Sequence, residues 1–172
     1  MPTPVMRDAT IADCAPLAGF WRDRFVETFA HLYRPDDLAA FLAASYSPAQ
    51  QMAEILAAGV EHRLSVDGLS VLGACQIGPL GLPIDPGPAK SIELKRLYLV
   101  EAAKGQGIGQ QLMDWAIERA VARGASRIYL GVWRHNERAQ RFYARNGFAK
   151  VGEYFFPVGS ALDEEDILLR ML

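Results

Sequence analysis

The sequence is poor in the residues that build disulfide frameworks and metal sites. It has two cysteines, Cys14 and Cys75, and three histidines among 172 residues. The cysteines do not form a Cys-x-x-Cys pair, the histidines are scattered, and no His-Glu-x-x-His segment occurs. We therefore expect both cysteines to be small buried apolar groups, and we expect no bound metal.

The sequence also lacks apolar runs long enough to cross a membrane. Runs such as residues 38–44 fall far short of the ~20 residues that a spanning helix needs. No charged segment followed by an apolar one opens the chain, so no secretory signal is visible and a cytoplasmic location is expected. With 51% hydrophobic residues and a net charge of −2, the composition excludes intrinsic disorder. The length predicts one domain over residues 1–172.

Hydrophobic periodicity and turn residues predict a mixed α/β fold. Helices are expected after Thr10, after Pro35, between Ser47 and Gly59, between Gly109 and Gly124, and between Asn136 and Asn146. The segment from Ser47 to Gln50 is a capping box with proline at the first helical position. A loop rich in glycine and proline is expected at 78–89. Strands are expected at 3–7, 62–66, 69–77, 91–100, 127–132, 148–156 and 166–172.

Charge is unevenly distributed along the chain. Residues 90–150 carry 12 Lys and Arg against 5 Asp and Glu, whereas residues 1–89 carry 5 against 10 and residues 151–172 carry 1 against 5. A basic middle between acidic flanks favours an anionic partner at the centre and a cationic one elsewhere, although an uneven solvated surface gives the same counts.

A glycine-rich turn between a predicted strand and a predicted helix is the strongest local motif. Glycines at 105, 107 and 109 let the main chain approach a ligand, and the helix that follows turns its N–H groups and positive dipole end toward an anion. A dinucleotide fingerprint needs a third glycine where Gln110 stands, and no Gly-Lys-Ser/Thr phosphate loop occurs. Close packing of the helix is the structural alternative.

Two segments carry a family resemblance. They are Lys104-Gly-Gln-Gly-Ile-Gly109 and, one strand later, Asn136-Glu-Arg-Ala-Gln-Arg-Phe-Tyr-Ala-Arg-Asn-Gly-Phe148. They resemble the pyrophosphate loop and the Asn…Phe-Tyr…Gly-Phe segment of the GCN5-related N-acetyltransferase superfamily. Lys104 departs from the usual Gln or Arg and offers a charge without a planar fork. The resemblance implies a single-domain fold with a central, mostly antiparallel sheet, splayed at the acetyl-CoA strand, and helices on both faces.

A narrower similarity concerns the acceptor. The segments 91–99 and 130–133, with the tail from Phe155 to Ile167, are similar to PaiA-type polyamine acetyltransferases of that superfamily. The tail carries the acidic run Asp163-Glu-Glu-Asp166, which is more acidic than that pattern.

The resemblance implies acetyl-CoA as co-substrate. The pyrophosphate is expected on the main-chain N–H groups of the glycine turn, and the pantetheine amides on the main chain of the preceding strand. Asn136 is expected either at the pantetheine arm or as a plain N-cap, and Arg138 and Arg141 are expected either at the phosphates or on a solvated helix face. The expected cofactor-binding residues are Leu97, Tyr98, Leu99, Lys104, Gly105, Gln106, Gly107, Ile108, Gly109, Gln110, Asn136, Arg138, Arg141 and Tyr143.

Two side chains are candidates for the proton transfers. Tyr143 matches the tyrosine acid of the family, with a core aromatic as the structural alternative. Strand alternation is expected to place Glu93, Lys95 and Leu97 on one face, where Glu93 acts as base directly or through water. The alternative for Glu93 is a strand carboxylate paired with Lys95 or Arg96.

Together these features predict an N-acetyltransferase acting on the primary amine of a small molecule, with polyamines as the leading class, by direct attack in a ternary complex. Glu27, Phe29 and Tyr33 are expected to hold the cationic acceptor by charge and ring face. A protein acetyltransferase and a non-catalytic acyl-CoA sensor are the alternatives. No nucleic-acid or membrane partner is expected, because CoA phosphates account for the basic run more economically. A homodimer is left open.

Overall fold

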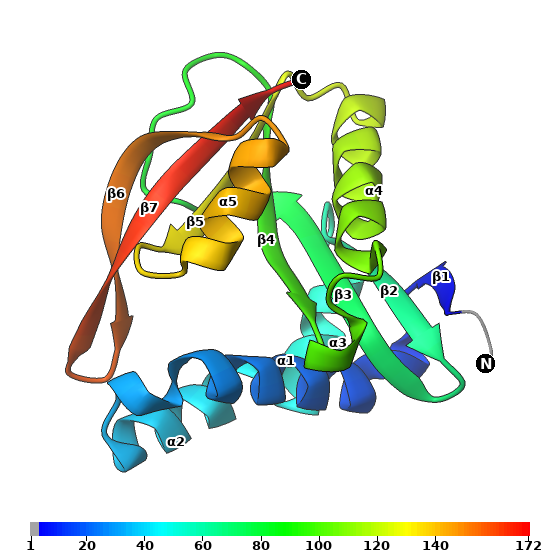
Figure 1. Ribbon diagram of the computed structural model, residues 1–172, viewed down its shortest axis with the longest axis vertical. Helices are drawn as coiled ribbons and strands as arrows, with labels where there is room; N and C mark the ends of the chain where they lie inside the picture. The colour runs from blue at the N-terminus through cyan, green and yellow to red at the C-terminus, as the bar shows by residue number, and fades with distance from the viewer. Residues whose placement is uncertain (1–3) are drawn as a thin grey trace.

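The computed structural model describes residues 4–172 (Figure 1). Its helices and strands follow the predicted order, and residue 3 of the predicted first strand lies outside the described residues. The strands are β1 (Val5–Asp8), β2 (Glu61–Asp67), β3 (Ser70–Pro79), β4 (Ser91–Leu99), β5 (Arg127–Trp133), β6 (Ala149–Val158) and β7 (Ala161–Met171). The helices are α1 (Cys14–Phe29), α2 (Pro35–Ser45), α3 (Pro48–Leu56), α4 (Ile108–Ala122) and α5 (Glu137–Arg145).

One sheet contains all seven strands, in the order β1-β2-β3-β4-β5-β7-β6. Every neighbouring pair is antiparallel except β4 and β5. These two parallel strands pair only from Ser91–Arg127 to Glu93–Tyr129 and then diverge, as Figure 1 shows. The predicted splay in a mostly antiparallel sheet is confirmed.

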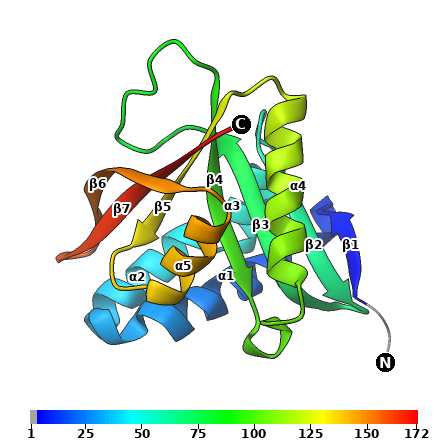
Figure 2. The same ribbon diagram turned by 45° about the horizontal axis from the view of Figure 1, so that its top comes forward.

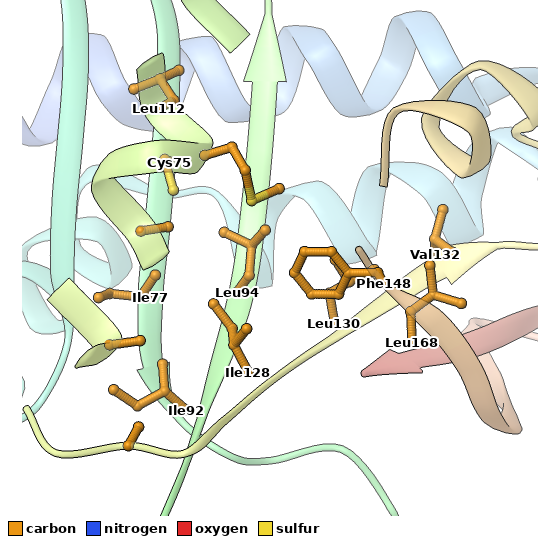
Figure 3. Packing of buried hydrophobic residues seen from close by; sticks show 14 of the residues in the cluster. Cys75, Ile77, Ile92, Leu94, Leu112, Ile128, Leu130, Val132, Phe148 and Leu168 are labelled. Carbon is orange, nitrogen blue, oxygen red and sulfur yellow. The ribbon is translucent and has the colours of Figure 1, made fainter. Parts of the chain in front are cut away.

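Helices cover both faces of the sheet, as predicted. On one face α4 and α5 pack over an apolar cluster drawn from β3, β4, β5 and β7; Figure 2 shows α4 lying along the strands. Figure 3 shows this cluster spreading with the splay, from Ile92 and Ile128 where β4 and β5 pair to Val132 and Leu168 farther along β5 and β7. On the other face α1 and α2 bury aromatic side chains in two further clusters. Within residues 4–172, no helix combines the length and apolar character needed to cross a membrane.

Local sequence explains several helix boundaries. Prolines stand at the starts of α2 and α3, where the missing N–H has no intrahelical partner to lose. The Ser47 side chain accepts the Gln50 N–H at 3.1 Å, so the cap is present. The reciprocal half of the predicted capping box is not formed, because the Gln50 side chain donates to Glu54 instead.

Two boundaries depart from the sequence-based expectation. β4 carries a bulge: Ile77 pairs with Leu94 and Gln76 with Arg96, so Lys95 has no partner in β3. β7 begins at Ala161 rather than at 166, and it therefore includes the acidic run of residues 163–166. The expectation was wrong because the carboxylates of this run find partners on other elements: Tyr33 contacts Asp163, and Arg134 pairs with Glu164 and Asp166.

Candidate active site

The divergence of β4 and β5 opens a cleft of about 980 Å³ between the glycine turn before α4 and the aromatic side chains of α1 and α2. Every predicted site residue lines it except Gln106 and Ile108. The Ile108 side chain is buried in the core, and the Gln106 amide donates to the Ala102 carbonyl at 2.6 Å. The contact expected of these two residues is through their main-chain N–H groups, and it stays a prediction.

The bulge at Lys95 sets on which face of the sheet the following side chains of β4 lie. Leu97 and Leu99 pack into the cluster beneath α4, whereas Arg96 and Tyr98 contact Trp21 of α1 on the opposite face. The prediction that Glu93, Lys95 and Leu97 share a face was therefore wrong, because the extra residue shifts the alternation. The edge of residues 95–99 that faces β5 has no strand partner among the described residues.

The glycine turn before α4 has the conformation that an anion site requires. Gly105 and Gly107 have φ angles of +80° and +81°, and a Cβ atom at either would meet nothing within 4 Å. Gly109 differs, because its Cβ would lie 3.2 Å from Leu99, so this glycine serves close packing of α4 on β4. The first-turn N–H groups of α4 point out of the helix, where the dipole favours negative charge.

Cationic side chains surround this turn. Lys104 and Arg138 both pair with the exposed carboxylate of Glu101, and the hydrogen bond from Lys104 lowers the pKa of that carboxyl. Arg141 pairs with Glu137 on its own helix at 3.4 Å. These exposed pairs are weak and exchange readily for a phosphate.

Two amide side chains stabilise the end of the cleft beside the glycine turn. The Asn136 carboxamide accepts the Ala139 N–H at 3.2 Å, which is the N-cap alternative, and a pantetheine contact stays a prediction. Gln110 donates to the Asn146 side chain at 2.8 Å and thereby links the first turn of α4 to the end of α5.

Tyr143 projects from α5 to line the cleft beside Phe142 and Phe148. Burial raises the pKa of its hydroxyl, and the neighbouring Cys75 and Glu165 raise it further. The phenol therefore keeps its proton at neutral pH, as a proton donor must.

Glu93 lines the cleft with a carboxylate that already has two donors. One of its oxygens accepts the Gly81 N–H at 2.7 Å and the Lys95 ammonium at 3.2 Å. The pair with Lys95 is the structural alternative that the sequence offered for Glu93, and the role of Glu93 as base stays a prediction. In the described part of the chain, His, Cys, Asp and Glu side chains do not gather into a group of three or more that could hold a metal ion.

A sequence model of the acetyltransferase (GNAT) family matches residues 17–148. The chain belongs to this family. An uncharacterized N-acetyltransferase from the pepI 3′ region of Lactobacillus delbrueckii subsp. lactis is 30% identical over 152 residues, which are 88% of this chain and 87% of that protein. The protein is therefore an acetyl-CoA-dependent N-acetyltransferase.

Solved structures share the GNAT fold at lower identity. The PaiA N-acetyltransferase of Thermoplasma acidophilum, in complex with coenzyme A, has a TM-score of 0.80 and 21% identity over 99% of this chain and 100% of that one. Arabidopsis thaliana NAA60, in complex with acetyl-CoA, has a TM-score of 0.75 and 17% identity over 99% of each chain.

The other end of the acetyltransferase's cleft is aromatic and acidic. Phe29 is buried against Trp133, with ring centroids 5.7 Å apart, and the Tyr33 hydroxyl donates to Asp163 of β7. Glu27 lies on the rim, with 57% of its side chain exposed, and pairs with Arg24. The structure thus brings all three predicted acceptor residues to one end of the cleft.

Glu165 of β7 was not predicted as an individual site residue. It lines the cleft, and its carboxylate accepts a hydrogen bond from the Tyr154 hydroxyl at 2.9 Å. Burial raises the pKa of this acetyltransferase's Glu165 to about 7; the Tyr154 hydrogen bond opposes that rise, and the charges of Asp163 and Asp166 add to it. The alternation of Asp163 and Glu165 is a signal that could have placed both on one strand face, had the acidic run been assigned to a strand.

Proposed function

We propose that this acetyltransferase transfers the acetyl group to a primary amine of a small cationic molecule, with polyamines as the favoured class. The observation that carries the proposal is the contrast within one cleft. Lys104, Arg138 and Arg141 line the end beside the glycine turn, whereas Asp163 and Glu165 line the end beside the aromatic side chains of α1 and α2. A molecule with several ammonium groups complements the second end by charge and by ring face.

The end of the cleft beside the glycine turn, between Lys104 and Gln110, is called the cofactor end here, and it has features that fit acetyl-CoA. The open space at Gly105 and Gly107 leaves room for a pyrophosphate against main-chain N–H groups, and the unpaired edge of residues 95–99 offers main-chain partners to the pantetheine amides. Acetyl-CoA supplies an acetyl thioester, whose carbonyl carbon accepts the amine. The proposed role of Lys104, Arg138 and Arg141 is to neutralise the phosphates.

Tyr143 is the proposed proton donor to the departing thiolate. Its hydroxyl is protonated at neutral pH, as that of an ordinary tyrosine is, and burial raises its pKa further. The side chain lies on the wall of the cleft. Glu93 is one candidate for the carboxylate that receives the proton of the acceptor ammonium, directly or through water.

The proposed transfer is direct, without a covalent enzyme intermediate. Cys75 is fully buried and its burial raises the pKa of the thiol, so it is a poor nucleophile. Cys14 is also buried, and neither cysteine is among the described residues that line the cleft.

An acceptor screen tests the proposal by following release of free thiol from acetyl-CoA with polyamines, amino acids, aminoglycosides and peptides. We expect the highest kcat/KM with polyamines. Faster reaction with peptides would instead make the protein a protein acetyltransferase, and tight binding of acetyl-CoA without any acceptor would make it a sensor. Tyr143→Phe serves as the control that thiol release depends on the proposed site.

A further inference from the structure

We propose that Glu165 is a catalytic residue, the base that takes the proton of the acceptor ammonium, and that Tyr154 positions its carboxylate. The inference rests on the proposed function, because it requires an amine acceptor. It assigns the proton transfer to a carboxylate of β7 rather than to Glu93 of β4.

Three other carboxylates of the cleft, on α1, α3 and β4, each form an ion pair: Glu27 with Arg24, Glu54 with Arg96, and Glu93 with Lys95. Asp163 of β7 forms no ion pair among the described residues, and it accepts a hydrogen bond from the hydroxyl of Tyr33. In Glu93 the Lys95 ammonium occupies a position that an acceptor ammonium would need. Among residues 4–172, Glu165 forms no ion pair, and its one hydrogen-bond donor is the neutral phenol of Tyr154.

The sheet presents Glu165 to the interior of the cleft. On β7 it pairs with Trp133 of β5 on one side and with Tyr154 of β6 on the other, so the carboxylate and the phenol are cross-strand neighbours. Both lie over Gly131 of β5, where a Cβ atom would come within 2.6 Å of the phenol oxygen and 3.2 Å of the carboxylate. Gly131 therefore makes the space that this pair occupies beside the splayed edge.

Glu165 lines the same cleft as the proposed acid, Tyr143. Its charge helps to raise the pKa of Tyr143 on α5, of Tyr98 on β4, of Tyr154 on β6 and of Tyr33 after α1. Base and acid thus line one cleft from different elements, β7 and α5, as transfer from an amine to a thioester requires.

The groups around Glu165 suit it to accept a proton near neutral pH. Asp163 and Asp166 on β7 act with burial to disfavour its charged form, and the Tyr154 phenol favours it. The charge of Glu93 on β4 also raises the pKa of that phenol. The resulting pKa, about 7, matches the value at which a general base is most effective.

The proton balance closes with these two side chains. Glu165 takes one proton from the ammonium, the freed amine forms a C–N bond to the acetyl carbon, and the C–S bond breaks. Tyr143 gives its proton to the departing sulfur and recovers one from the new amide nitrogen. Glu165 then releases its proton to solvent, so each turnover yields one acetamide, one thiol and one proton.

The test compares the pH dependence of kcat/KM for the wild type, Glu165→Gln and Glu93→Gln, with a diamine as acceptor. In the wild type kcat/KM should rise with pH and bend near 7, well below the ionisation of an alkylamine at about 10. Glu165→Gln should lose roughly 10²–10⁴-fold in kcat/KM at pH 7 together with the bend, while its Kd for acetyl-CoA stays unchanged. Glu93→Gln should keep the bend.

The pH profile of Tyr154→Phe is a second test, and it does not depend on whether Glu165→Gln folds. Loss of the phenol donor should move the bend to higher pH, an effect that a purely structural role for Tyr154 would not produce. The proposal is overturned if Tyr154→Phe leaves the bend in place, or if Glu93→Gln abolishes it while Glu165→Gln stays within threefold of the wild type. A wild type that acetylates no amine overturns the proposed function itself.

Discussion

The two ends of the cleft offer a ligand different chemical groups. The end near α4 presents main-chain groups: the N–H groups of the glycine turn and the unpaired edge of β4. The end near α1 and β7 presents side chains from elements far apart in the sequence, such as Tyr33 and Asp163. A main-chain site suits a ligand shared by a whole family, whereas a side-chain site can change its acceptor without disturbing the fold.

The largest effect on the rate should come from a change at Tyr143, the proposed acid on the wall of the cleft. Tyr143→Phe removes one hydroxyl and little volume, so kcat should fall by roughly 10²–10⁴ while the Kd for acetyl-CoA is nearly constant. Tyr129→Phe is the matched control, because Tyr129 is buried in β5 and does not line the cleft. Both variants are measured by steady-state kinetics. If the kcat of Tyr143→Phe lies within threefold of the kcat of Tyr129→Phe, Tyr143 is a core aromatic residue and not the acid.

The cofactor end should respond to a change in the turn. Gly107→Asp places a negative charge beside the expected pyrophosphate, and the Kd for acetyl-CoA should rise at least ~100-fold, or about 2.7 kcal/mol. Because Gly107 has a positive φ, Gly107→Ala controls for backbone strain. Calorimetry on the folded variants measures this Kd. If Gly107→Asp binds acetyl-CoA as tightly as the wild type does, the pyrophosphate does not lie at this turn.

The end of the cleft lined by Glu27, Tyr33 and Asp163 should favour an acceptor that carries a second positive charge. A diamine should exceed a monoamine of equal length in kcat/KM by about 5- to 150-fold if a partly buried carboxylate pairs with the distal ammonium. Asp163 is 8% exposed and Glu27 lies on the rim, so Asp163→Asn should reduce the preference more than Glu27→Gln. The preference should also shrink with added salt. Equal kcat/KM for both acceptors at low salt would favour a peptide or neutral acceptor.

The smallest effect concerns stability. The pKa of Glu165 is raised from 4.5 in the unfolded chain to about 7 in the fold, so its contribution is complete below pH 4.5 and is lost as pH rises toward 7 and beyond. Glu165→Gln should therefore stabilise the protein relative to the wild type by about 1–3 kcal/mol more at pH 8 than at pH 4.5. Denaturant unfolding at the two pH values measures the difference. A difference of the opposite sign would show that the carboxylate is not desolvated.

The cofactor end could be predicted from the sequence because its determinants are local. The glycines at 105 and 107, the Asn136 cap and Tyr143 lie within short segments whose turn chemistry and helix periodicity fix the nearby main chain. Gln106 and Ile108 do not line the cleft with their side chains, and their expected contacts through main-chain N–H groups stay a prediction.

The sequence by itself determined the order of the elements, the caps and the glycine turn, because each depends on residues a few positions apart. Only the tertiary structure decided which residues share the cleft. The bulge at Lys95 arises from pairing between β3 and β4, and it reverses the face on which Leu97 lies. The acidic run became a strand because Tyr33, Tyr154 and Arg134, distant in the sequence, supply partners for its side chains. Strand pairing and carboxylate satisfaction are non-local interactions, and periodicity along one segment carries no record of them.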